Sequence, residues 1–220
     1  MKAFIGAIVV VCILTVLYFV YDSQQTVHVP PPSSTATSTT ADLYQIIPGV
    51  PSIMYTDPRF GFSLYYPATA ALKATGFDGY LPLTHTPLIA FTLNPDMFVG
   101  TNLNEAGLYV GATTSPSIVA HCVEPIINDL ETIASSSVMI QGTVFDEFDS
   151  TGAAAGNIYQ ERVFRTVRDG TCMEFVELLH SGNIDNYPKG KVVAFDSAAF
   201  TGTLDSMLQT LTFTRTATPK

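Results

Sequence analysis

The sequence has no tryptophan, three cysteines and few charges: 13% of its 220 residues are charged, 10 of them Lys or Arg and 19 of them Asp or Glu. A protein that binds nucleic acid or anionic lipid headgroups through charge needs a basic stripe. The net charge of −9 and the absence of such a stripe exclude this class, so we expect no nucleic-acid partner.

The motifs of several enzyme and cofactor classes are also missing. The chain has no GxxxxGK[ST] phosphate loop, no GxGxxG turn, no HExxH helix and no GxSxG elbow. The four histidines, His28, His85, His121 and His180, lack the spacing of a metal site. We therefore expect no cofactor, no metal site and no catalysis. A hydrolase with paired carboxylates stays as an alternative, because such pairs are assembled in space rather than in sequence.

The first 21 residues contain a long apolar run. Ala3 to Tyr21 has 19 residues without a charge, which at ~1.5 Å per residue spans a ~30 Å hydrocarbon core. Residues 1–21 therefore predict a transmembrane signal-anchor helix. Lys2 predicts the N-terminus inside and the rest of the chain outside the cytoplasm, as in a single-pass protein of the cell membrane.

Two other interpretations of this segment fit less well. A cleaved signal peptide has an apolar core of ~7–15 residues and a small-x-small cleavage site, whereas this run is longer and ends in YFVYDSQQ. A lipid-modified Cys12 would follow a small residue and end the apolar segment, but Val11 precedes it and more apolar residues follow.

Residues 22–52 differ sharply in composition from what precedes them. Three consecutive prolines, Pro30 to Pro32, are followed by seven Ser or Thr among the eight residues from Ser33 to Thr40. Such a segment has too little apolar area to offset the entropy of ordering. We expect a disordered linker that holds the following domain away from the membrane.

Residues 53–216 have the composition of a folded domain. Two β-rich arms, Ile53–Thr56 and Phe62–Tyr66, flank a turn at Asp57-Pro58-Arg59-Phe60-Gly61 and predict a hairpin. Alternation places Phe62 and Tyr66 on its core side. Residues 68–87 are expected to be irregular. Further strands are predicted at 88–93, 106–113, 142–149, 157–168 and 171–180, and at the final segment LTFTR.

Two segments show helical periodicity. Residues 121–135 place apolar side chains on one face of a helix, and a second helix, capped by Asp196 or Ser197, follows the same rule. The apolar positions are Ile126, Ile127, Leu130, Ile133 and Ala134 in the first helix, and Phe200, Leu204, Met207, Leu208 and Leu211 in the second. Together these elements predict an α+β fold, an antiparallel β-sheet flanked by helices and preceded by one transmembrane helix.

The pair Asp169-Gly170 suits a two-residue type I′ turn, because both of its positions take a positive φ. This turn sets a register with Arg168 opposite Thr171. The register aligns two opposite-charge pairs, Arg165 with Glu174 and Arg162 with Glu177, and two apolar pairs, Phe164 with Phe175 and Val163 with Val176.

Cys122 and Cys172 are the two cysteines after the apolar run, and an exported domain lies in an oxidising compartment. We predict a disulfide between them. Two buried free thiols are the alternative. A nucleophilic thiol assisted by His121 or His180 is a further one, but it lacks a third orienting group.

The acidic run Asp146, Glu147, Phe148, Asp149 fails the pattern of a DxDxDG calcium loop in either register. In a strand, Asp146 and Phe148 lie on one face and Glu147 and Asp149 on the other. We interpret the run as a solvated sheet edge, with weak metal binding at the three acids left open.

The domain resembles the PsbP-like family at its two ends. The resemblance rests on the hairpin from Tyr55 to Pro67 (YTDPRFGFSLYYP) and on the closing segment from Asp205 to Phe213 (DSMLQTLTF). It implies an α/β/α sandwich that acts as a non-catalytic, membrane-tethered binding or assembly module, and it implies no catalytic residue. We expect the membrane and an envelope protein as partners, with a tethered cell-envelope hydrolase as the alternative function.

Overall fold

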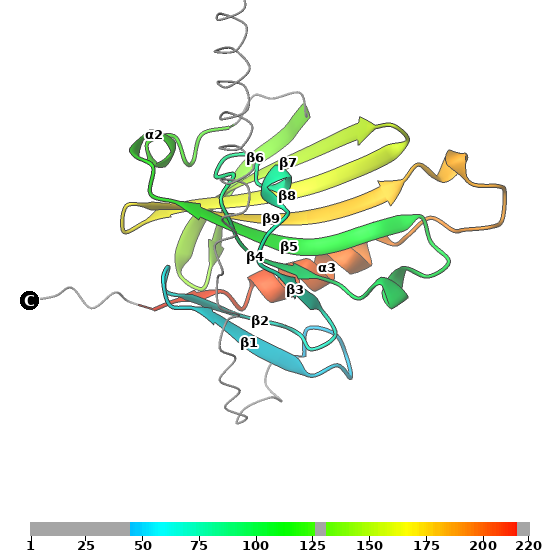
Figure 1. Ribbon diagram of the computed structural model, residues 1–220, viewed down its shortest axis with the longest axis horizontal. Coiled ribbons are helices and arrows are strands. Elements are labelled where there is room, and N and C mark those ends of the chain that lie inside the picture. The colour runs from blue at the N-terminus through cyan, green and yellow to red at the C-terminus, as the bar shows by residue number, and fades with distance from the viewer. Residues whose placement is uncertain (1–44, 126–130, 215–220) are drawn as a thin grey trace, which may run out of the picture. The chain divides into compact units, whose positions relative to one another are not determined.

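The computed structural model describes residues 45–125 and 131–214, which form two antiparallel sheets (Figure 1). The larger sheet has the strand order β3-β4-β5-β9-β8-β7-β6. Its strands are β3 (Ala71–Lys73), β4 (Pro87–Thr92), β5 (Leu103–Thr113), β6 (Glu131–Ile140), β7 (Thr143–Ala154), β8 (Asn157–Arg168) and β9 (Thr171–Gly182). The described helices are α2 (Pro116–Val119), α3 (Ser197–Leu208) and the 3-10 turns η1 (Asp78–Tyr80), η2 (Pro95–Phe98) and η3 (Ile184–Asn186).

The smaller sheet has the order β1-β2-β10 and contains the predicted hairpin. Its strands are β1 (Ser52–Asp57), β2 (Phe62–Pro67) and β10 (Thr212–Phe213). The Asp57 carboxylate closes the hairpin by accepting hydrogen bonds from the backbone N–H groups of Arg59 and Phe60. Phe62 and Tyr66 are buried, which confirms the side on which the core was predicted.

The register predicted from Asp169-Gly170 is confirmed throughout the β8–β9 hairpin. Asp169 and Gly170 have φ values of 49° and 72°, as a type I′ turn requires. Arg168 lies opposite Thr171, and the four other predicted pairs lie opposite each other. The turn and the charged and apolar side-chain pairs favour the same register, so local and cross-strand preferences specify one pairing.

One face of the larger sheet is covered by α3 and the smaller sheet, and we call it the α3 face. Phe62 of β2 packs edge-on against Phe175 of β9, with ring centroids 5.8 Å apart. The helix begins where Asp196 accepts a hydrogen bond from the Ala199 N–H, and it buries three predicted residues, Leu204, Met207 and Leu208. The hydrophobic core therefore lies between this face and its two covering elements.

The opposite face of the larger sheet is covered by irregular segments. Phe77 and Leu81, on either side of η1, are buried and form a second apolar cluster with Tyr109 and Val176 of the sheet. The described residues form no helical layer on this side, so the complete α/β/α sandwich is not seen in them. The structure confirms the coarser prediction, an antiparallel β fold with few helices.

The helix predicted at 121–135 is wrong in both of its described parts, because residues 121–125 form turns and irregular backbone after α2, and β6 begins at Glu131. Residues 126–130 lie outside the described residues. The strand is favoured by its pairing with β7 through a turn at Gln141-Gly142, whose φ values are 45° and 80°. Pairing across that turn buries Ile140 and overrides the helical spacing of the apolar residues.

Ordered packing starts earlier than Ile53, where the sequence places the beginning of the domain. Ile46 is buried, and its N–H donates to Ser52 Oγ, so the folded part includes the end of the expected linker. The apolar run at 1–21 lies outside the described residues. Within the described residues, no helix has the length and apolar character to cross a membrane.

Candidate functional site

The two cysteines singled out by the sequence lie together. Cys122, three residues after α2, forms a disulfide with Cys172 at the start of β9, with Cα atoms 5.6 Å apart. Both residues are fully buried. Neither cysteine is therefore a free thiol, and the nucleophilic interpretation with His121 or His180 has no support in this geometry.

The three histidines in the described residues lie apart from one another in different environments. His85 is exposed, and His121 lies 3.0 Å from a carboxylate oxygen of Glu124. His180 stacks on Tyr159 with ring centroids 4.5 Å apart and bonds Asn157 at 3.0 Å. His28 lies outside the described residues. His180 thus contacts the neighbouring strand β8, and His121 contacts the turn that follows α2.

The acidic run is not at a sheet edge, which corrects its interpretation as a solvated edge: β7 pairs with both β6 and β8. The alternation holds. Asp146 accepts a hydrogen bond from Ser137 on one face, while Glu147 and Asp149 pair with Arg162 on the other. In the described part of the chain, no three His, Cys, Asp or Glu side chains are arranged to hold a metal ion.

Arg162 of β8 is the centre of a charge cluster on the α3 face. Its guanidinium lies 2.7 Å from Glu147, 3.0 Å from Glu177 and 3.7 Å from Asp149. It also reaches Asp205 of α3 at 2.7 Å. One cation therefore serves four carboxylates from three elements, which ties the helix to the sheet and leaves the cluster with excess negative charge.

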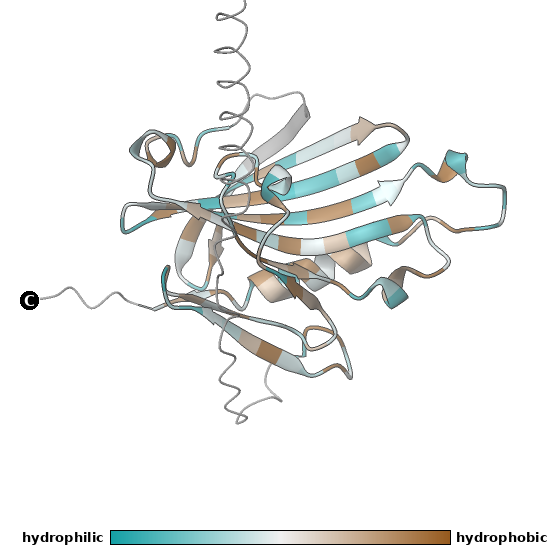
Figure 2. Cartoon of the chain, in the orientation of Figure 1, coloured by the Kyte–Doolittle hydropathy of each residue, from teal (hydrophilic) through white to brown (hydrophobic). Residues whose placement is uncertain are grey.

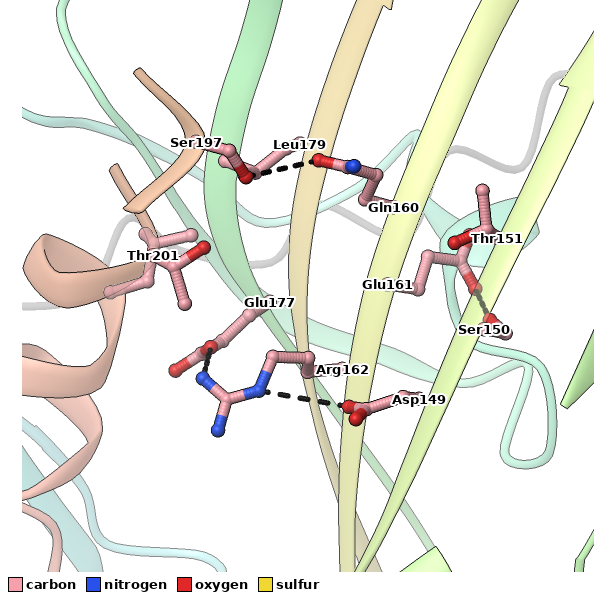
Figure 3. A pocket seen from close by; sticks show the side chains of 11 residues that line it. Asp149, Ser150, Thr151, Gln160, Glu161, Arg162, Glu177, Leu179, Ser197 and Thr201 are labelled. Atoms are coloured by element: carbon pink, nitrogen blue, oxygen red, sulfur yellow. Dashed lines mark hydrogen bonds and ion pairs between the residues drawn. The ribbon is translucent and has the colours of Figure 1, made fainter. Parts of the chain in front are cut away.

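A cavity of about 190 Å³ lies beside this cluster, between β7, β8 and β9 and the first turns of α3. Figure 3 shows Asp149 and Glu177 on opposite sides of the Arg162 guanidinium, whereas the Glu161 side chain is turned toward Ser150. Hydrophilic residues are frequent along β7 and β8 in Figure 2, in keeping with this polar lining. The lining residues are Asp149, Ser150, Thr151, Gln160, Glu161, Arg162, Glu177, Leu179, Ser197, Thr201 and Leu204.

Glu177 is the most perturbed acid of the cavity. Burial and then the charge of Asp205 raise its pKa to about 8, although Arg162 acts in the opposite direction. Burial also raises the pKa of Asp149 and of Glu161. Within the described residues, Glu177 Oε1 and Asp149 Oδ1 are buried oxygens without a hydrogen-bond partner. Buried titratable groups of this kind mark functional sites more often than chance.

Sequence reasoning identified part of this site. The register predicted the Arg162–Glu177 pair, and the acidic run included Glu147 and Asp149. The sequence did not reveal that these acids share one arginine, or that Asp205 joins them. A signal for Glu147 and Asp149 was present, because alternation already put them on one face, but the two-residue turn Ala155-Gly156 that sets the β7–β8 register was not located from the sequence.

A second feature lies on the face opposite α3. Met139, Val144 and Val167 are 68%, 54% and 45% exposed. Met139 lies opposite Val144, and continuing the β7–β8 register by two residues from Asp146–Arg165 puts Val144 beside Val167. These three residues form an apolar row across β6, β7 and β8, on the same face as the disulfide. We call it the apolar row.

No family model matches the sequence, and no curated protein matches it. Among solved structures, the chain is similar to cyanobacterial PsbP (CyanoP) from Synechocystis sp. PCC 6803. The identity is 12%, the TM-score is 0.46, and the alignment covers 81% of this chain and 99% of that chain. A Bacteroides thetaiotaomicron VPI-5482 protein matches with 17% identity and a TM-score of 0.40, over 74% of this chain and 48% of that chain.

Both TM-scores are below 0.5, and both identities are below 25%. Neither similarity assigns an activity, a ligand or a partner to this chain.

Proposed function

We propose that this protein is a non-catalytic binding and assembly module of the PsbP-like family, anchored by its N-terminal apolar run and presented outside the cytoplasm to an envelope protein. The observation that carries the proposal is the buried Cys122–Cys172 disulfide. Disulfides persist in oxidising compartments, so the bond supports the export expected from Lys2 and the apolar run.

The apolar row supports the binding part of the proposal. Three exposed apolar side chains on neighbouring strands are what a protein partner covers, because their removal from water favours association. A partner that binds there meets a surface beside the disulfide, at the end of the sheet formed by β6, β7 and β8. This contact would leave the Arg162 cluster, on the other face, uninvolved.

Site-specific photocrosslinking in native membranes tests this function. A photoreactive phenylalanine analogue at Val144 or Met139 of the full chain is expected to give a discrete crosslinked protein. The same analogue at Val193, which is 65% exposed and outside the apolar row, serves as the control. Equal crosslinking at all three positions, or none at any, would contradict the proposal. A reporter fused after Lys220 tests export separately.

A tethered hydrolase of cell-envelope material is the second candidate, because Glu177 has the raised pKa of a general acid and lies near Asp149. Two features disfavour it. The cavity is smaller than the ~300–1,000 Å³ of typical ligand pockets, and Arg162 engages both acids. Release of soluble fragments from purified envelope polymer by the wild-type chain, lost in Glu177→Gln, would establish the hydrolase instead.

A further inference from the structure

The cavity beside Arg162 is lined by more acids than bases. The carboxylates of Asp149 and Glu177 line it against the single cation Arg162. Arg162 is also shared with Glu147 and Asp205, which lie next to the cavity. Because one guanidinium serves all of these carboxylates, a second positive charge in the cavity would be attracted electrostatically.

Two buried oxygens show which group is missing. Glu177, whose side chain is 3% exposed, uses Oε2 to accept from Arg162, and its Oε1 has no hydrogen-bond partner among the described residues. In Figure 3 the second carboxylate oxygen of Glu177 points away from Arg162, toward α3. Asp149 Oδ1 also lacks a hydrogen bond, although Arg162 lies 3.7 Å away. When both carboxylates are ionised these oxygens are acceptors, so the ionised site lacks donors.

We propose that this cavity binds a small organic ammonium ion, whose N–H groups donate to Glu177 Oε1 and Asp149 Oδ1. Charge-assisted hydrogen bonds of this type are the strong ones. The cavity of about 190 Å³ equals the volume of roughly six water molecules, which suits an amine with a short alkyl chain. Leu179 and Leu204 provide apolar lining for that chain.

Other occupants fit less well. A metal ion needs several ligands arranged around one point, and the described residues contain no such group of three. A neutral alcohol supplies a donor but leaves the excess negative charge uncompensated. The site lies on the α3 face, opposite the apolar row, so it is independent of the partner surface proposed above.

The acids around Glu177 predict how binding depends on pH. Three charged side chains surround Glu177: Arg162 on β8, Glu147 on β7 and Asp205 on α3. An ammonium ion favours the ionised form of Glu177. Burial and the charge of Asp205 raise the pKa of this carboxyl to about 8. Affinity is therefore expected to increase between pH 6 and about pH 9, below the ~10.4 at which an alkyl ammonium group deprotonates. Binding at pH 7 should release a proton.

Isothermal titration calorimetry of the full chain in non-ionic detergent tests the site. The probe is propylammonium chloride at pH 8 and low ionic strength, with sodium chloride and 1-propanol as the charge and shape controls. Saturable binding is expected for propylammonium alone. Glu177→Gln and Asp149→Asn are each expected to weaken it by about tenfold or more. Asp185→Asn, which removes an exposed acid outside the cavity, should leave binding unchanged.

Three results would overturn the proposal. These are no saturable binding by the wild-type chain, equal binding of 1-propanol, or wild-type affinity in both cavity variants. Should Glu177→Gln fail to fold by circular dichroism, Asp149→Asn decides, because Asp149 is 43% exposed and its substitution disturbs the core less.

Discussion

Arg165 Nε donates to Glu174 Oε1 at 2.9 Å, and the two side chains are 2% and 0% exposed. The carboxylate also accepts from the backbone N–H of Leu83 and of Thr84 and from Thr84 Oγ1. Arg165 in turn donates to the Glu124 carbonyl. This pair thus anchors two irregular segments to the sheet, which explains how a face without a helical layer is kept covered.

Removing one partner of this pair is expected to be costly. Arg165→Met leaves the Glu174 charge buried and unpaired, so the free energy of unfolding should fall by about 3–5 kcal/mol. The matched control is Lys73→Met, which breaks the exposed pair with Glu105 and should cost less than about 1 kcal/mol. Urea denaturation of the full chain in detergent measures both. Similar losses in the two variants would contradict the anchoring role.

The disulfide is expected to provide a large share of the stability. Replacing both Cys122 and Cys172 by alanine opens a loop of sequence separation 50 and should lower the free energy of unfolding by about 2–5 kcal/mol. Thermal denaturation with and without reductant measures this. The wild-type chain should respond to reductant and the double variant should not. A wild-type chain that is indifferent to reductant would show that the bond contributes little.

Because of Glu177, the free energy of unfolding is expected to decrease as the pH rises. Its pKa is about 8 in the folded chain and about 4.5 in the unfolded chain, so the folded state binds the extra proton between these values. The stabilisation is complete below about pH 4.5 and is lost as the pH rises toward 8. Urea midpoints measured from pH 5 to pH 9 should fall in the wild-type chain and fall less in Glu177→Gln. Parallel curves for the two proteins would rule this origin out.

Two glycines predict opposite effects of the same substitution. Gly170 has a φ of 72°, which a side chain disfavours, so Gly170→Ala should destabilise by about 1 kcal/mol. Gly202 lies inside α3, where an added Cβ meets no atom within 4 Å, and Gly202→Ala should stabilise by about 0.5–1 kcal/mol. Chemical denaturation resolves the sign of each, and equal signs would be inconsistent with the turn geometry.

The accuracy of the sequence predictions depended on the distance along the chain over which the deciding contacts act. The β8–β9 register was predictable because the predicted charge pairs flank the Asp169-Gly170 turn at sequence separations of only 9 and 15. The strand at Glu131–Ile140 was missed, because its pairing with β7 outweighs its helical periodicity. The Arg162 cluster was missed in part for the same reason, since Asp205 reaches it from a helix 43 residues later in the chain.

The Cys122–Cys172 bond encloses β6, β7 and β8, so nearly half of the larger sheet belongs to one covalent ring. A protease that cuts the backbone once inside this ring produces two fragments that stay linked and stay paired with β9. The chain would thereby survive a single cleavage as one molecule, and the damage would become visible only on a reducing gel.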